Sequence, residues 1–214
     1  MTSGRILCAN PLVVIYDDFA DQAELEELQS VDFGEFQRAG VLKSGVKTVD
    51  DSRTNTQALV DQWSHPVLAG ICERVSSVVR IPPENCEHAK LLNYLPGQKF
   101  DSHHDAYDDF MPDAVLELMA GGQRLFTTIL YLNEVEEGGE TDFPRLRVSV
   151  RPVPGRLLLF ANTLPGQTER HPHSLHAGTP VIKGEKRVLS LWWRERMFHV
   201  PREYPEESGP VTTV

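Results

Sequence analysis

The chain contains little cysteine. Among its 214 residues only Cys8, Cys72 and Cys86 carry a thiol, and no two of them form a CxxC pair. An odd number of widely spaced cysteines argues against a disulfide framework and against a zinc knuckle. The pattern is typical of buried thiols in a reducing compartment.

A long apolar run is missing as well. The longest one near the start, "PLVVIY", is far shorter than the roughly 18 to 20 residues that a membrane span needs. It follows no basic leader, and the acidic "DDF" comes directly after it. We therefore expect no signal peptide, no membrane partner and a cytoplasmic location.

Positive charge is also scarce, since 21 lysine and arginine residues stand against 31 aspartate and glutamate residues, a formal net charge of −10. An acidic surface repels phosphate backbones, so nucleic acid is not an expected partner. The chain has no internal repeat, and its length suits one well-filled core.

The regular elements present divide the chain into two parts. The pattern predicts a strand over 12–19, then helices around 21–30 and 65–79, where apolar residues recur three or four apart. From Ala89 onward, short apolar runs alternate with glycine and proline, which is typical of an all-β sandwich or barrel. Residues 199–214 are polar and rich in proline, and we interpret them as a loosely ordered tail.

The stretch "KFDSHHDAY", residues 99–107, contains a candidate metal site. On a strand or strand end, residues two apart share a face, so His103 and Asp105 would point together while His104 turns away. Two histidines and one carboxylate form the facial triad of non-haem Fe(II) oxygenases. Alone, the triplet is a weak signal, because it occurs more often as an exposed histidine and a solvated aspartate.

A third ligand must come from a distant strand. His171 and His173 lie in a polar loop with proline, where we expect surface residues, whereas His176 begins a strand-like run. Lys186 follows ten residues later, after a turn at "KGE" that we expect to bring its strand beside that of His176.

Alternation in the last predicted strand places Lys186, Val188, Ser190 and Trp192 on one face. A lysine that faces a β interior needs an anion, which a dicarboxylate ligand or a structural salt bridge could supply.

Together these motifs resemble the prolyl 4-hydroxylase-like branch of the Fe(II)/2-oxoglutarate-dependent dioxygenases. The resemblance is carried by "NYLPGQKFDSHHD", "RLFTTILYLNEVEEGGETDFPRL", "VSVRPVPGRLLLFAN" and "SLHAGTPVIKGEKRVLSLWW". It implies a mainly β (α+β) fold with a double-stranded β-helix (jelly roll, cupin-like) core and N-terminal supporting helices. We expect one domain over 1–198, with 1–88 supporting a core at 89–198.

The resemblance also implies roles for single residues. His103, Asp105 and His176 match the family's iron ligands and catalytic set, and Lys186 matches the residue that binds the far carboxylate of 2-oxoglutarate.

Three further cofactor-binding residues follow in the same way. Tyr94 matches the tyrosine that hydrogen-bonds the cosubstrate, Thr127 a threonine near the same carboxylate, and Trp192 a tryptophan that lines the site. Trp193 faces the other way, and we expect it in the core.

The implied activity is hydroxylation of a C–H bond. The resemblance implies that the enzyme binds Fe(II), consumes 2-oxoglutarate and O2, and uses ascorbate as a reductant. Ser102, His104 and Ala106 depart from the family pattern at the rim of the site, so the substrate is either a prolyl residue in a peptide or protein, or a free amino acid or small natural product. A cupin-like binding module without catalysis is the rival from another class. The acidic stretch 106–122 is the expected lid.

Overall fold

The computed structural model describes residues 3–43, 46–108 and 114–199. The predicted tail, apart from His199, lies outside the described residues, and so do residues 109–113 of the predicted lid.

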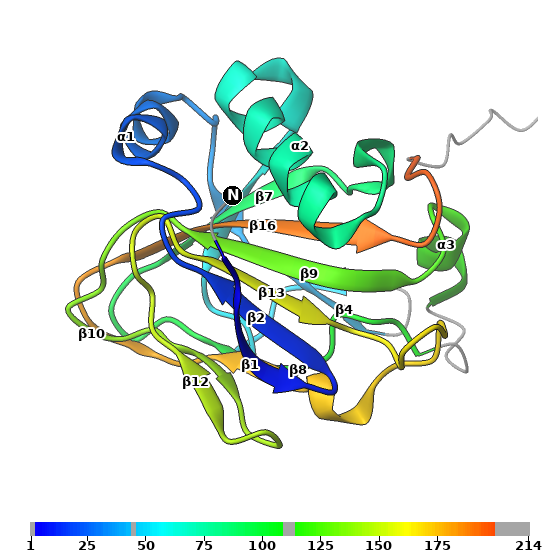
Figure 1. Cartoon of the computed structure of the whole chain (residues 1–214). Helices are drawn as coiled ribbons and strands as arrows, with labels where there is room; N and C mark the ends of the chain where they lie inside the picture. The colour runs from blue at the N-terminus through cyan, green and yellow to red at the C-terminus, as the bar shows by residue number, and fades with distance from the viewer. Residues whose placement is uncertain (1–2, 44–45, 109–113, 200–214) are drawn as a thin grey trace, which may run out of the picture.

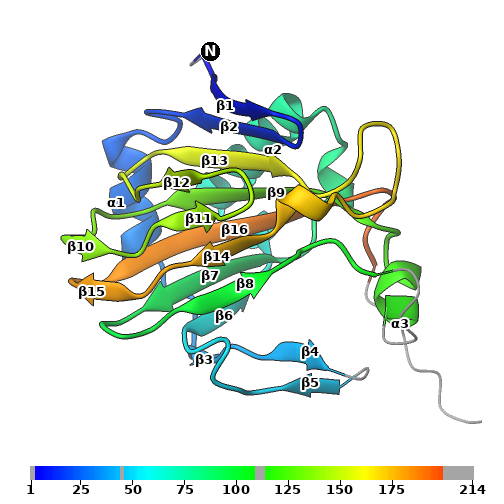
Figure 2. The ribbon, with the colours of Figure 1, turned by 90° about the horizontal axis from the view of Figure 1, so that it is seen from below.

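Two sheets packed face to face form the body of the protein (Figure 2). The larger sheet is antiparallel and has the strand order β1-β2-β13-β9-β16-β7-β6-β3, so strands from the N-terminal part flank strands from the C-terminal part. Its strands are β1 (Arg5–Ala9), β2 (Leu12–Tyr16), β3 (Gln37–Arg38), β6 (Thr56–Val60), β7 (Ala89–Tyr94), β9 (Arg124–Tyr131), β13 (Leu157–Ala161) and β16 (Lys186–Arg194).

The smaller sheet has the order β12-β11-β14-β8 and is also antiparallel. The pairs β10–β15 and β4–β5 form two separate two-stranded sheets. The strands outside the larger sheet are β4 (Val41–Lys43), β5 (Val46–Thr48), β8 (Phe100–His103), β10 (Glu137–Gly138), β11 (Thr141–Phe143), β12 (Val148–Val150), β14 (His176–Gly178) and β15 (Val181–Lys183).

The order in which the chain visits the two sheets defines the fold. From β8 onward, β8, β11 and β14 belong to the smaller sheet, while β9, β13 and β16 belong to the larger one. Phe143 on β11 and Phe160 on β13 meet between the sheets, with ring centroids 5.1 Å apart. This alternation is the double-stranded β-helix, and the predicted fold class is confirmed.

Helices cover the outer face of the larger sheet (Figure 1). α1 (Gln22–Ser30) begins at Asp21, whose side chain accepts from the backbone of Glu24 in a capping box, and α2 (Pro66–Val79) begins with proline at its first position. Buried apolar residues from both helices share one cluster with the outer face of the sheet. The two predicted helices are confirmed. The shorter helical segments are η1 (Gln62–Ser64), η2 (Pro83–Asn85), α3 (Ala114–Met119) and η3 (Pro172–Ser174).

β16 is buried on both faces because helices cover one side and the smaller sheet covers the other. Leu189, Leu191 and Trp193 pack with the helices, and the indole N–H of Trp193 donates to the hydroxyl of Thr128. The alternate residues, from Lys186 to Trp192, line an interior cavity. The predicted alternation is confirmed, and Trp193 lies in the core as expected.

The prediction that the strand of Lys186 lies beside the strand of His176 is wrong. β14, which begins with His176, pairs with β8 and β11, whereas β16, which begins with Lys186, pairs with β7 and β9. The two residues therefore lie on opposite sheets, across the interior from one another. The short turn at Gly184 leads from β15 into the other sheet because the chain alternates between sheets in this fold.

Candidate metal centre

His103 and Asp105 are placed by the end of β8. His103 is the last residue of the strand, and Asp105 follows two residues later. β8 pairs with β14 in a register that sets His103 opposite His176. Strand pairing thus brings together residues that are far apart in the sequence.

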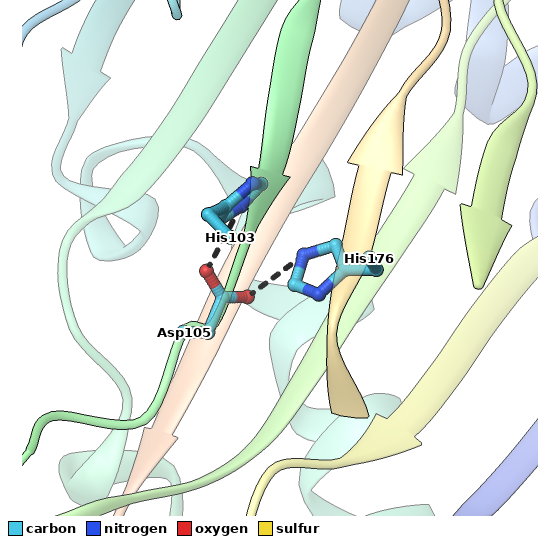
Figure 3. A group of neighbouring side chains, drawn as sticks. All are labelled: His103, Asp105 and His176. Atoms are coloured by element: carbon cyan, nitrogen blue, oxygen red, sulfur yellow. Dashed lines mark ion pairs between the residues drawn. The ribbon is translucent and has the colours of Figure 1, made fainter. Parts of the chain in front are cut away.

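The three side chains converge on one point (Figure 3). Nε2 of His103 lies 3.5 Å from Oδ1 of Asp105, and Nε2 of His176 lies 3.6 Å from Oδ2 of the same carboxylate. One ligand atom from each residue lies within 4.8 Å of the others. In the part of the chain that the structure describes, this is the group of histidine, cysteine and acidic side chains close enough to hold a metal ion.

Backbone carbonyls orient both imidazoles. Nδ1 of His103 lies 2.8 Å from the carbonyl oxygen of Asp101, and Nδ1 of His176 lies 2.9 Å from that of Ser174. A carbonyl oxygen only accepts, so each Nδ1 carries the hydrogen and each Nε2 presents its lone pair to the cluster. This is the arrangement that metal-binding histidines require.

The protonation states also suit a cation. Burial would raise the pKa of Asp105, but the neighbouring imidazoles of His176 and His103 lower it well below its ordinary value. Burial lowers the pKa of His176 to about 4. At neutral pH the centre therefore offers a carboxylate and a neutral buried imidazole, the forms in which these groups bind metals.

The donor set fits a divalent first-row metal. Bonds of about 2.1 Å place neighbouring ligand atoms about 3 Å apart around one ion. The spacings of 3.5 and 3.6 Å are close to that value. Two imidazoles and one carboxylate on one side of an ion leave its other positions open, as in non-haem Fe(II) centres.

The hydroxyl of Thr127, on β9, donates to Oδ2 of Asp105 at 2.6 Å. It is 1% exposed and lines the same cavity as Lys186. Its observed hydrogen bond is to the carboxylate of the metal centre, and its proximity to a cosubstrate carboxylate stays a prediction.

An interior cavity adjoins the three residues, between the two sheets. Sequence reasoning identified Tyr94, Thr127, Lys186 and Trp192 in its wall. It missed Thr141, although the residue lies in the quoted "GGETDF" stretch; its hydroxyl accepts from that of Tyr131 at 2.7 Å. The remaining lining residues are Arg53, Leu92, Phe100, Ile129, Gly178, Val188 and Ser190.

Lys186 supplies a positive charge at the closed end of this cavity. It is 3% exposed, and its Nζ lies 5.2 Å from the ring centre of Tyr94 and 5.7 Å from that of Tyr131. Among the described residues no carboxylate oxygen lies within 4.0 Å of this Nζ. Burial lowers the pKa of Lys186 to about 8, so it remains mostly charged at neutral pH and suits an anionic ligand.

Trp192 separates the interior cavity from a wider outer cleft and lines both. Its ring lies between two cations, Nζ of Lys90 at 4.6 Å and the guanidinium carbon of Arg124 at 4.8 Å from the ring centre. The buried indole N–H has no hydrogen-bond partner among the described residues.

The outer cleft has a volume of about 510 Å³ and reaches the metal centre through His103 and Asp105. His104, expected to turn away from the metal, lines this cleft, and its Nδ1 lies 3.2 Å from the hydroxyl of Ser174. It takes no part in the group of possible ligands.

The expectation that His171 is a surface residue is wrong. It is 4% exposed, and its ring lies within hydrogen-bond distance of Asn10 and of the backbone N–H of His173. Polar neighbours in sequence suggested exposure, but the β1–β2 turn covers this side chain. His173 is exposed as expected.

A buried ion network forms the wall of the cleft behind Trp192. Glu87 accepts from Arg124 at 2.5 and 2.7 Å and from Arg194 at 2.8 Å. Burial alone would raise the pKa of Glu87, but the two arginines and Lys90 outweigh this effect and lower it to about 2. The network thus joins the start of β7 to β9 and β16.

We expect Glu87→Gln to reduce the free energy of unfolding at pH 7 by about 3–5 kcal/mol, because two buried guanidinium groups lose their counter-charge. The folded pKa lies below the ordinary value of 4.5, so this stabilisation is complete above pH 4.5 and is lost as the pH falls towards 2. Urea unfolding at several pH values measures it. Glu136→Gln, which breaks an exposed pair with Lys183, should cost less than about 1 kcal/mol; equal losses in both variants would refute the prediction.

Comparison with known proteins agrees with this geometry. The sequence profile of the 2OG-Fe(II) oxygenase superfamily matches residues 89–194. Prolyl 4-hydroxylase 2 of Arabidopsis thaliana is 31% identical over 207 residues, which cover 86% of this chain and 67% of the relative. The chain belongs to the prolyl 4-hydroxylase-like branch of the 2-oxoglutarate/Fe(II) oxygenases.

Viral proteins are among the other relatives. A putative prolyl 4-hydroxylase of Acanthamoeba polyphaga mimivirus is 35% identical over 149 residues, or 70% of this chain, and the chain spans only 62% of that relative's length. The crystal structure of the viral collagen prolyl hydroxylase vCPH from Paramecium bursaria Chlorella virus-1, a 2-oxoglutarate complex, matches with a TM-score of 0.68 at 28% identity. That match covers 88% of this chain and 98% of the viral one. The resemblance inferred from the motifs is confirmed.

Proposed function

We propose that the chain is an Fe(II)- and 2-oxoglutarate-dependent dioxygenase that hydroxylates prolyl residues in a peptide or protein and releases succinate and CO2. The observation that carries the proposal is the convergence of His103, Asp105 and His176 beside a cavity that is lined by a buried lysine, Lys186, for which the described residues supply no ion-pair partner. In this proposal the first three residues hold Fe(II).

The cavity supplies a matching set of groups for the cosubstrate. Lys186 binds the far carboxylate of 2-oxoglutarate through a charge-assisted hydrogen bond. Tyr94 and Thr141 line the wall nearby, with Thr127 closer to the metal carboxylate and Trp192 at the outer end. With the cosubstrate bound, Fe(II) and O2 supply the oxidation of a C–H bond. The described residues position the reactants and exclude water.

The outer cleft is the proposed substrate site. It is open to solvent, approaches the metal centre and offers both acidic and basic side chains beside Trp192. A cleft of about 510 Å³ accommodates part of an extended peptide better than it encloses one free amino acid. The complete ligand set argues against a cupin-like module without catalysis.

A succinate-release assay with a substrate panel tests the function. Release should require Fe(II), 2-oxoglutarate and O2 together, and should rise with proline-rich peptides more than with free proline or other free amino acids. Stimulation by free amino acids alone would assign the enzyme to the rival substrate class. Omission of ascorbate should shorten the linear phase of turnover, which tests its proposed role as reductant.

We also propose one domain over residues 1–198, because β1, β2, β3 and β6 belong to the same sheet as strands of the 89–198 core. None of the helices in the described ranges is long and apolar enough to cross a membrane. A cytoplasmic location is proposed because Cys8, Cys72 and Cys86 are free thiols.

A further inference from the structure

Asn162 follows β13 directly and is 0% exposed. Its Nδ2 donates to the hydroxyl of Thr127 at 2.8 Å, and that hydroxyl donates to Oδ2 of Asp105 at 2.6 Å. Two consecutive hydrogen bonds therefore lead from a buried amide to the carboxylate of the candidate metal centre.

The direction of these bonds is determined by chemistry. A carboxylate that binds a metal only accepts, so the single hydroxyl hydrogen of Thr127 must point to Asp105. The oxygen of Thr127 is then left as an acceptor, and only the NH2 group of Asn162 can donate to it. This fixes which way the amide faces.

The amide is kept in this orientation at a cost to folding. Oδ1 of Asn162 is buried and has no hydrogen-bond partner among the described residues. Native proteins retain few such groups, and each of them calls for an explanation other than stability. A leucine of similar volume would leave no unpartnered oxygen there.

The backbone of Asn162 supports a second ligand. Its carbonyl oxygen accepts from the backbone N–H of His171 at 2.9 Å. It also lies 3.3 Å from the hydroxyl of Ser174, whose shorter hydrogen bond, 2.8 Å, is to the carbonyl oxygen of His171. The carbonyl of Ser174 in turn accepts from Nδ1 of His176. One residue therefore contacts the supports of two of the three candidate ligands.

We propose that Asn162 is a positioning residue of the metal centre. Through Thr127 it holds Asp105 in the rotamer that faces His103 and His176. This inference rests on the proposed function, since it requires that the three residues bind a metal.

Cobalt(II) titration of the metal-free protein, followed by visible absorption, tests the inference without turnover. Asn162→Leu should weaken Co(II) binding roughly 10- to 100-fold, the usual effect of losing an outer-shell partner. Thr127→Val should weaken it by a similar factor, and Thr127→Ser, which keeps the hydroxyl, should stay within about 3-fold of the parent.

A double-mutant cycle then separates positioning from general destabilisation. If Asn162 acts through Thr127, Asn162→Leu should change the Co(II) affinity less than about 3-fold in a Thr127→Val background. Asn85→Leu is the matched control, because Asn85 is also buried and donates to the backbone of Arg194, away from the metal ligands. It should lower the melting temperature and leave the Co(II) affinity unchanged.

Two results would overturn the inference: unchanged Co(II) affinity in Asn162→Leu, or full additivity of the two substitutions. Where Asn162→Leu yields no folded protein, Asn162→Ala takes its place in the same cycle. Absence of Co(II) binding by the parent protein would instead contradict the proposed function, so the two failures are distinguishable.

Discussion

Replacing His176 with alanine is expected to abolish succinate release. Loss of an outer-shell partner of a metal typically costs roughly 10- to 100-fold in affinity or activity, and loss of a direct ligand should cost more, on the order of 1000-fold. The substitution leaves one imidazole and one carboxylate, and both metal affinity and ligand geometry depend on the third donor.

The measurement needs a folded variant, because His176 also packs against aromatic rings. Its ring centroid lies 4.6 Å from that of Phe160 and 5.7 Å from that of Phe143. His176→Gln fills most of the same volume and should lose activity to a similar extent while changing the melting temperature less. His173→Ala, at an exposed histidine in the preceding segment η3, is the matched control and should keep parental activity.

His103→Ala should reproduce the loss, since both imidazoles contact the same carboxylate. Turnover that persists in both alanine variants would refute the assignment of the ligands. Loss of turnover with undiminished Co(II) binding would show that the two histidines serve catalysis in another way.

Replacing Lys186 with alanine should raise the KM for 2-oxoglutarate roughly 30- to 3000-fold, the range seen when one partner of a buried charge pair is removed. The carboxylate would enter a cavity that a second buried cation, Arg53, also lines. Arg53 already donates to Asn55 and to the carbonyl oxygen of Gly40. Lys186→Arg keeps the charge and should recover part of the affinity. Lys183→Ala removes an exposed lysine of the neighbouring strand β15 and should change the KM little.

The pH dependence provides a second readout. Because the pKa of Lys186 in the free protein is lowered to about 8, kcat/KM for 2-oxoglutarate should fall as the pH rises above about 8, where the lysine loses its charge. The fall should be absent in Lys186→Arg, since arginine stays protonated. An unchanged KM in Lys186→Ala would show that another residue anchors the cosubstrate.

The elements that local pattern determines were predicted well. The two helices follow from apolar residues at helical spacing, and the face of β16 that carries Lys186 and Trp192 follows from strict alternation in a strand. His103 and Asp105 were predicted as candidate ligands because residues two apart on a strand end share a face and because both match the family's motif. Each of these features depends only on residues that are close together in the chain, so a single sequence is enough to predict it.

Features that depend on strand pairing were harder to predict from the sequence. A turn at "KGE" is locally compatible with a hairpin, and nothing in its sequence shows that the chain crosses to the other sheet before Lys186. His171 was misassigned for the same reason: its loop is polar, but the distant β1–β2 turn covers it.

By itself the sequence indicated the branch of oxygenases, because four of its motifs resemble that branch, and this resemblance identified the candidate ligands and the lysine. Only the tertiary structure decided which sheets these residues occupy, and only it revealed the chain from Asn162 through Thr127 to Asp105 and the network around Glu87. The physical reason is that these contacts join segments between 22 and 107 residues apart. Hydrogen bonds of that kind arise from packing, and a side chain's neighbours in the sequence do not specify them.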